Sequence, residues 1–237
     1  MSMLLAAPGV GFVLFQALPP GRAVNQIMIM LQVQVLLGVQ FLTVNARSYL
    51  SRAFEVTRQF LFKWTVNWRF VGEETFLARR FGASLLIANL VLLAMFAHTR
   101  WTKPAGLSPM ALLRTIIYPL PPRAQQQIGK SVTAEFTMIT ILSSLVVGLL
   151  CARTLHYQFF AYLSWTTPFL LWKSQFPAPL AIAIWGLQEL AWNIYPSTNA
   201  SSSTVVACLA LQVVGIWYGT REDLTKRSHG KGTKEYD

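Results

Sequence analysis

The sequence predicts an all-α fold, a polytopic bundle of transmembrane helices. Of the 237 residues, 54% are hydrophobic and only 12% are charged, whereas soluble domains carry about 25% charged residues. Burial of a core does not explain so large a deficit in a chain of this length. Several charge-free windows also reach the length of roughly 20 mostly apolar residues that a spanning helix needs. A helical membrane protein is therefore the expected class.

We expect about seven membrane spans along the chain. The apolar windows place them near residues 2–18, 27–44, 81–97, 132–151, 158–172, 176–195 and 203–219. The fifth window is short and could be re-entrant, so a count of six stays open. The first window has no basic region before it and stays apolar as far as Leu18, so we interpret it as a span rather than a secretory signal.

The loop over residues 46–80 carries seven basic residues against three acidic ones. Within it, Leu50, Phe54, Leu61 and Trp64 recur at helical spacing, with charged residues between them. This pattern predicts an amphipathic helix lying in the membrane interface. A solvated connector that covers its neighbours is the alternative.

The loop over residues 98–130 is rich in proline and contains basic residues but no acidic one, which is typical of a cytoplasmic loop. The polar tail, residues 221–237, is expected to be disordered and cytoplasmic. Counting back through seven spans then places residues 46–80, 153–157 and 196–202 in the lumen. The seven basic residues of loop 46–80 conflict with the rule that basic residues favour cytoplasmic loops. Either these residues bind phosphate in the lumen, or one span has been miscounted.

The formal net charge of +11 is carried by loops between the spans, so phosphate or anionic lipid is the expected partner rather than nucleic acid. Cys151 and Cys208 lie in apolar windows and are expected to be buried small hydrophobes. The sequence shows no metal-ligand cluster, phosphate loop or nucleophile motif, so no metal or cofactor is predicted. Asn199 begins a glycosylation acceptor so close to a predicted span that access to it would be poor.

Three polar clusters near the predicted membrane surface are candidates for a binding site. The first is "TVNWRFVGEETF", whose candidate residues are Asn67, Trp68, Arg69, Glu73 and Glu74. Arg69 could grip a phosphate through its guanidinium fork, and Trp68 could stack on a sugar ring. An interface anchor, with the acidic residues neutralising nearby arginines, is the alternative.

The second cluster is "RTLHYQFF", with Arg153, His156, Tyr157 and Gln158 at the start of an otherwise apolar stretch. A lone histidine is usually structural, but ionisable groups at a membrane surface are costly and often mark function.

The third cluster is "GLQELAWNIYPSTNAS", in which Glu189 and Asn193 share a helix face. Glu189 either donates to or accepts from a neighbouring helix, or it lines a cavity. All three clusters fall on the predicted luminal side, which favours one polar site there.

The same stretches resemble a known family. "TVNWRFVGEETFLARRF", "CARTLHYQFFAYLSWTTPFLLW" and "LQELAWNIYPSTNAS" look like signature stretches of the dolichyl-phosphate-mannose-dependent alpha-1,3-mannosyltransferases of the endoplasmic reticulum, which belong to the GT-C class. The version here resembles the fungal ones, and the resemblance runs from the first span to Gly219. It implies transfer of mannose from dolichyl-phosphate mannose to Man5GlcNAc2-diphosphodolichol, in alpha-1,3 linkage, on the luminal face, during assembly of the N-glycan precursor.

The resemblance also implies roles for the three clusters. Cations should stabilise the charge that develops on the leaving phosphate, and we expect this of Arg69, Arg153 and His156. Contacts with the sugar rings and hydroxyls are expected from Trp68, Tyr157, Gln158 and Asn193.

The sequence departs from the GT-C pattern in its acidic residues. The class carries its catalytic acidic residue in the first luminal loop, whereas this chain has no aspartate before Asp223 and begins in what resembles an internal passage. We therefore expect that residue to lie upstream of Met1, and this C-terminal part of the enzyme to be inactive alone. A transporter with Glu189 and His156 as a proton relay, or a non-catalytic membrane subunit, are the alternatives.

Overall fold

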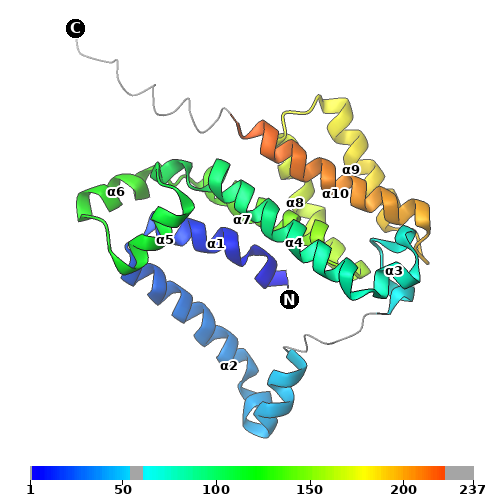
Figure 1. Cartoon of the computed structure of the whole chain (residues 1–237), viewed down its shortest axis with the longest axis horizontal. Helices are drawn as coiled ribbons and strands as arrows, with labels where there is room; N and C mark the ends of the chain where they lie inside the picture. The colour runs from blue at the N-terminus through cyan, green and yellow to red at the C-terminus, as the bar shows by residue number, and fades with distance from the viewer. Residues whose placement is uncertain (1, 54–60, 222–237) are drawn as a thin grey trace.

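The computed structural model describes residues 2–53 and 61–221. These residues form helices and loops and include no strand, which confirms the predicted all-α bundle (Figure 1). The longer helices are α1 (Ser2–Ala17), α2 (Pro20–Ala53), α4 (Arg79–Phe96), α7 (Ala134–Cys151), α8 (Phe160–Lys173), α9 (Ala178–Trp192) and α10 (Asn199–Gly219). The shorter ones are α3 (Glu73–Leu77), α5 (Pro109–Ile117) and α6 (Pro122–Ser131), with single turns at Phe62–Trp64, Arg69–Val71, Ala97–Trp101, Lys103–Ala105 and Tyr157–Phe159.

Helices occupy all seven windows in which spans were predicted. By length and composition, four segments of the described chain are long and apolar enough to cross a membrane: Pro20–Ala53, Arg79–Ala105, Ala134–Cys151 and Asn199–Gly219. Helices α8 and α9 have 14 and 15 residues, fewer than the roughly 20 that a perpendicular span needs. The number of spans therefore stays a prediction.

Helix α7 lies at the centre of the bundle, because 11 of its 18 residues are buried. The hydrophobic core joins it to α4, α8, α9 and α10. Cys208 is buried and Cys151 half-buried, and both are free thiols.

Small residues let α1 pack closely against α7. A Cβ atom added to Gly9 would lie 2.6 Å from the carbonyl oxygen of Thr140 and 2.9 Å from the Cα of Ile141, so the two backbones are in contact there. Ser144 donates its hydroxyl hydrogen to the carbonyl of Leu5 across the same interface, at 2.9 Å. Close approach at small residues is the usual way in which membrane helices associate.

Replacing Gly9 with alanine is expected to lower the free energy of unfolding by about 1.5 kcal/mol, because the overpacked helices must separate. Gly11 is the matched control, since a Cβ there meets nothing within 4 Å. Gly11→Ala should leave stability unchanged or raise it by up to about 1 kcal/mol, because alanine favours the helix. Reversible unfolding in mixed micelles measures both, and equal effects of the two changes would contradict this packing.

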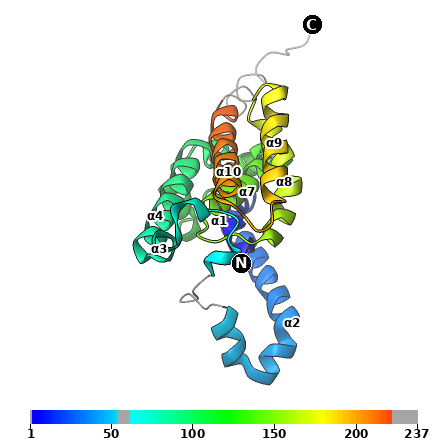
Figure 2. The same ribbon diagram turned by 90° about the vertical axis from the view of Figure 1, so that its right-hand side faces the viewer.

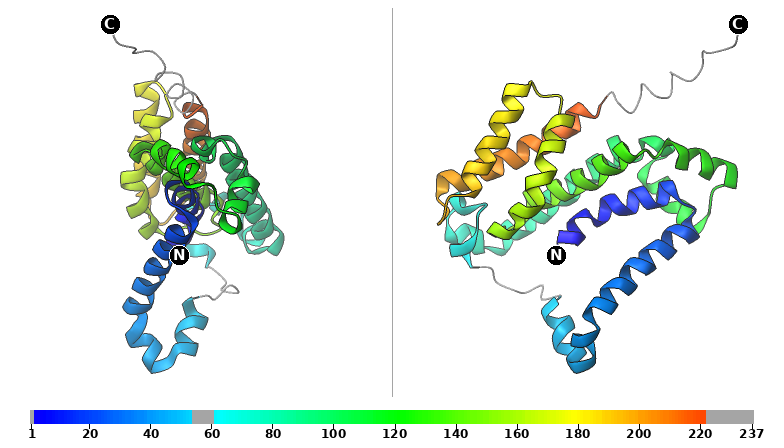
Figure 3. Two further views of the ribbon diagram at one scale, coloured as in Figure 1. Left: turned by 90° about the vertical axis from the view of Figure 1, so that its left-hand side faces the viewer. Right: turned by 180° about the vertical axis from the view of Figure 1, so that it is seen from behind.

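The bundle has two ends, at which the helices begin and finish. At one end, α7 and α9 finish, α4, α8 and α10 begin, and α3 lies beside the first turn of α10 (Figures 1 and 3). We call this the loop end and define it as residues 61–78, 152–159 and 193–202. The opposite end contains α5, α6 and the turn between α1 and α2.

At the opposite end of the bundle, Arg100 binds the last turn of α10. Its Nε and Nη2 atoms donate to the carbonyl oxygen of Trp217 at 2.9 and 2.6 Å, and its guanidinium lies 4.9 Å from the centre of the Trp217 ring. Arg100 therefore satisfies a carbonyl in the last turn of α10, where a cation also complements the helix dipole.

The segment expected as a proline-rich loop differs from that expectation, because it contains α5 and α6. Proline stands at the first position of both helices, where its missing N–H has no intrahelical partner to lose. The side chain of Ser108 also caps α5 by accepting from the backbone N–H of Ala111 at 3.1 Å. The prolines therefore begin helices here as well as interrupting them.

Helix α2 diverges from the bundle (Figure 2) and is kinked at Asn45, whose φ and ψ are −156° and 81°. Beyond the kink the chain turns back, so that Tyr49 stacks on Phe41 with ring centres 5.6 Å apart. Part of the predicted amphipathic helix, residues 54–60, lies outside the described residues, as does the predicted tail of residues 221–237 beyond its first residue.

Candidate functional site

The first predicted cluster is tied to the second by a buried tripeptide, Thr65 to Asn67. Asn67 is fully buried. Its Nδ2 donates to the carbonyl of Ala152 at 2.6 Å, and its Oδ1 accepts from the backbone N–H of Leu155 at 2.8 Å. The N–H of Val66 donates to the carbonyl of Leu155 at 2.8 Å. Asn67 therefore organises the loop end and is not itself exposed to a ligand.

The third cluster contacts the other two, partly through two serines that were not among the predicted site residues. Ser197 donates its hydroxyl to the carbonyl of Thr65 at 2.6 Å, and Ser202 accepts from the backbone N–H of Arg69 at 2.7 Å. The hydroxyl of Tyr157 donates to the carbonyl of Ile194 at 2.8 Å. The three stretches thus converge at the loop end, as expected.

Two of the predicted phosphate-binding cations flank a pair of phenylalanine rings. The guanidinium of Arg69 lies 5.1 Å from the ring centre of Phe62, and that of Arg153 lies 5.7 Å from the ring centre of Phe76. The two rings meet edge to face with centres 5.3 Å apart. Because guanidinium groups stack well on aromatic faces, this arrangement fixes both cations while leaving donor edges unused.

Carboxylates do not neutralise these cations within the described part of the chain. An ion pair joins Lys173 and Glu135, but it lies at the opposite end. Glu73 and Glu74 are exposed, so the structure gives no support to their pairing with Arg69. The Nη1 of Arg69 and the Nε1 of Trp68 are both buried without a hydrogen-bond partner. Buried donors without acceptors are rare and costly, so these two are candidates for hydrogen bonds to a ligand.

The backbone at this point is strained. Trp68 has φ 54° and ψ 13°, in the left-handed region that bulky residues rarely adopt. Nearby Gly72 has φ 83°, where glycine carries no such cost. Strain of this kind persists only where surrounding contacts impose it, and it often accompanies functional sites.

His156 lies beside an aromatic surface. Its Nδ1 is 3.2 Å from the carbonyl oxygen of Trp64. A hydrogen on Nδ1 would be donated to that carbonyl, which would orient the imidazole ring. The Trp64 ring stacks on Tyr195 with centres 6.3 Å apart, and Tyr195 meets Tyr157 at 5.6 Å. Trp64 and Tyr195 are 40% and 65% exposed, and the ammonium of Lys63 lies 5.3 Å from the centre of the Trp64 ring.

Glu189 and Asn193 share a helix end, as expected from their spacing, because the side chain of Asn193 donates to the carbonyl of Glu189 at 2.8 Å. The hydrogen bonds between helices are made by the neighbouring Gln188, which donates to Thr167 at 2.8 Å and accepts from Gln212. Gln158 and Asn193 are exposed at the loop end.

Within residues 2–53 and 61–221, no three His, Cys, Asp or Glu residues lie together so as to bind a metal ion. The chemistry that the loop end offers is that of fixed cations, unsatisfied buried donors and exposed aromatic faces. Such groups suit a ligand with a phosphate and sugar rings.

The fold and this end define a helical membrane protein with a polar end that carries arginine side chains. The chain belongs to the ALG3 protein family, which matches residues 1–202. The family resemblance of the three stretches is therefore confirmed. No solved structure matches the chain.

Relatives in fungi, animals and plants carry the name Dol-P-Man:Man(5)GlcNAc(2)-PP-Dol alpha-1,3-mannosyltransferase. The Neurospora crassa protein is 45% identical over 242 residues, which are 99% of this chain and 54% of the relative. The human protein is 39% identical over 236 residues, 98% of this chain and 52% of the relative. The Arabidopsis thaliana protein is 33% identical over 227 residues, 94% and 52% of the two chains. The chain thus spans about half the length of these relatives.

Proposed function

We propose that the chain takes part in the transfer of mannose from dolichyl-phosphate mannose to Man5GlcNAc2-diphosphodolichol, in alpha-1,3 linkage, during assembly of the N-glycan precursor. Membership of the ALG3 protein family and the names of the relatives support this reaction. We place the chain in the endoplasmic reticulum membrane, with the loop end in the lumen and the C-terminus in the cytoplasm.

The observation that carries the proposal is the convergence at the loop end of cations that no carboxylate of the described residues neutralises. In the reaction, the bond between the anomeric carbon of mannose and the phosphate oxygen breaks, and a bond to the acceptor hydroxyl oxygen forms. The leaving phosphate diester becomes a monoester and gains negative charge. Arg69 and Arg153, both stacked on rings, stabilise that charge. The base that takes the acceptor proton is not among the residues assigned here.

The aromatic surface beside His156 suits the sugar-bearing part of a substrate. Sugar rings present C–H groups on one face, which pack on aromatic rings, and Trp64 and Tyr195 both have exposed ring atoms for such contacts. Tyr157 belongs to the same surface, and His156, Gln158 and Asn193 supply polar groups near it. We assign the phosphate to the side with Arg69 and the sugars to the side with His156.

Photo-crosslinking tests this placement. A dolichyl-phosphate mannose analogue with a photoreactive group on the sugar is incubated with the full chain in nanodiscs, and labelled peptides are mapped. We expect labelling of residues 61–78, 152–159 or 193–202 that unlabelled dolichyl-phosphate mannose abolishes and unphosphorylated dolichol does not. Competed labelling found only in α5, α6 or α2 would overturn the proposal.

A further inference from the structure

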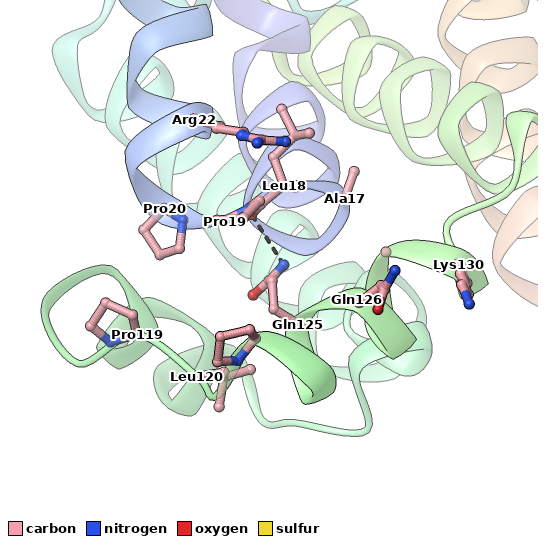
Figure 4. Close-up of a pocket in the computed structure, with 12 residues that line it drawn as sticks. Ala17, Leu18, Pro19, Pro20, Arg22, Pro119, Leu120, Gln125, Gln126 and Lys130 are labelled. Atoms are coloured by element: carbon pink, nitrogen blue, oxygen red, sulfur yellow. Dashed lines mark hydrogen bonds between the residues drawn. The ribbon is translucent and has the colours of Figure 1, made fainter.

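A cavity of about 580 Å³ lies at the opposite end of the bundle from the candidate site (Figure 4). One wall is the turn that joins α1 to α2, residues 17–22. The other is α6 with the turn before it, residues 119–130. Its volume falls within the range of about 300–1,000 Å³ that is usual for sites that bind small molecules.

The walls of this corner cavity are held together by specific contacts. The side-chain amide of Gln125 donates to the carbonyl of Gln16 at 3.0 Å and to the carbonyl of Leu18 at 3.1 Å, the bond drawn in Figure 4. At the other end of α6, a Cβ atom added to Gly129 would lie 2.9 Å from the carbonyl oxygen of Ala17. These contacts fix α6 on the end of α1. They also satisfy carbonyls at the α1 C-terminus, which would otherwise make the cavity more negative.

The cavity carries uncompensated positive charge. Arg22 extends from the first turn of α2 and Lys130 from the last turn of α6, and both line the cavity (Figure 4). None of its lining residues is acidic, and residues 1–54 and 75–134 contain no Asp or Glu at all. The N-termini of α2 and α6, at Pro20 and Pro122, also contribute to its lining, and a helix N-terminus adds positive potential.

The rest of the lining is apolar and continues along an apolar helix. Leu18, Leu120 and the prolines of both turns face the cavity. From the same turn begins α2, which exposes Met28, Leu31 and Val35 among many apolar side chains. Its most apolar window is only 6% buried within the described structure. A ligand that suits both features has an anionic head and long apolar tails.

We infer that the corner cavity binds the headgroup phosphate of an anionic phospholipid, whose acyl chains lie along α2. Arg22 and Lys130 neutralise the phosphate, and the leucine and proline side chains contact the glycerol and the first methylene groups. Basic pockets between membrane helices bind lipid headgroups in this way. The inference concerns a different end of the molecule from the mannose-transfer site and does not depend on that function.

Lipid labelling in nanodiscs tests the inference. The full chain is placed in phosphatidylcholine nanodiscs with increasing amounts of photoreactive phosphatidylinositol, and crosslinked peptides are quantified. We expect saturable labelling of residues 17–31 and 119–130. In Arg22→Gln with Lys130→Gln, half-saturation should require about 25-fold more lipid, because each cation near an anionic lipid contributes about five-fold to binding.

The control has the same change in charge at the same end of the molecule. Arg114→Gln with Arg123→Gln removes two exposed cations that do not line the cavity, and half-saturation should shift by less than two-fold. A second variant, Leu120→Trp, fills the cavity without altering charge and should abolish saturable labelling. Retention of labelling by Leu120→Trp would overturn the inference even if the charge variant failed to fold.

Two further experiments distinguish binding of a lipid headgroup from binding of free phosphate. Inorganic phosphate at matched ionic strength should leave the labelling unchanged, and photoreactive phosphatidylcholine should label the cavity residues weakly and without saturation. Complete displacement by inorganic phosphate would show an anion site without lipid specificity and would contradict the inference. Equal labelling by the two lipids, or an equal shift in both charge variants, would contradict it as well.

Discussion

Replacing Arg69 with alanine is expected to lower the rate of mannose transfer by about 100-fold, the usual loss when one group that stabilises transition-state charge is removed. The side chain lies on the ring of Phe62 with its Nη1 buried and unpartnered, so the guanidinium is available to a phosphate. The backbone N–H that binds Ser202 is unaffected by the change. Transfer is measured with this chain supplied together with the part of the Neurospora crassa relative that it does not match.

Two comparisons distinguish a role in catalysis from one in folding. Arg69→Lys keeps the positive charge but loses the fork that binds two phosphate oxygens, so activity should be intermediate. Arg114→Ala removes an exposed arginine at the opposite end and should change the rate by less than two-fold. A rate for Arg69→Ala within two-fold of the unmodified chain would remove Arg69 from the phosphate site.

Replacing Gln212 with leucine is expected to lower the free energy of unfolding by about 3 kcal/mol, because two buried polar groups lose their partners at about 1.5 kcal/mol each. Thr167 donates its hydroxyl to Gln212 Oε1 at 3.1 Å, and Gln212 Nε2 donates to Gln188. All three side chains are at most 1% exposed. The substitution leaves the Thr167 hydroxyl hydrogen and the Gln188 carbonyl oxygen unpaired between α8, α9 and α10.

A double-mutant cycle tests whether these three residues act as one network. Because Gln188→Leu removes one of the groups that Gln212→Leu strands, the double variant should lose less stability than the sum of the single variants. Gln158→Leu, an exposed glutamine at the loop end, should change stability by less than about 0.5 kcal/mol. Additive losses measured by reversible unfolding would rule out the network.

Composition and charge-free windows predicted the fold class and the position of each long helix, because apolar length is a local property. The helices within 98–130 were not predicted, since their proline content was interpreted only as a sign of a loop. Ser108 followed by Pro109 is the signal that marks the start of α5. The kink at Asn45 and the return of Tyr49 onto Phe41 depend on contacts across the bend and have no such signal.

The convergence of the three polar clusters was predicted from their positions at span ends, and the structure brings them together. The sequence did not predict which residues of these clusters make structural contacts and which are exposed to a ligand. Asn67 was expected to touch substrate, yet its amide joins two loops 85 residues apart. Glu189 was a candidate for hydrogen bonds between helices because it is a carboxylate, whereas the adjacent Gln188 makes those hydrogen bonds. Which polar side chains face a neighbouring helix depends on the rotation of each helix in the bundle.

The most direct measurement compares mannose transfer in two variants with the same change in charge. One carries Arg69→Gln with Arg153→Gln at the loop end, and the other carries Arg114→Gln with Arg123→Gln at the opposite end. We predict that transfer falls to background in the first and stays within two-fold of the unmodified chain in the second, with both variants folded. Equal rates in the two variants would show that the loop end is not where the phosphosugar is bound.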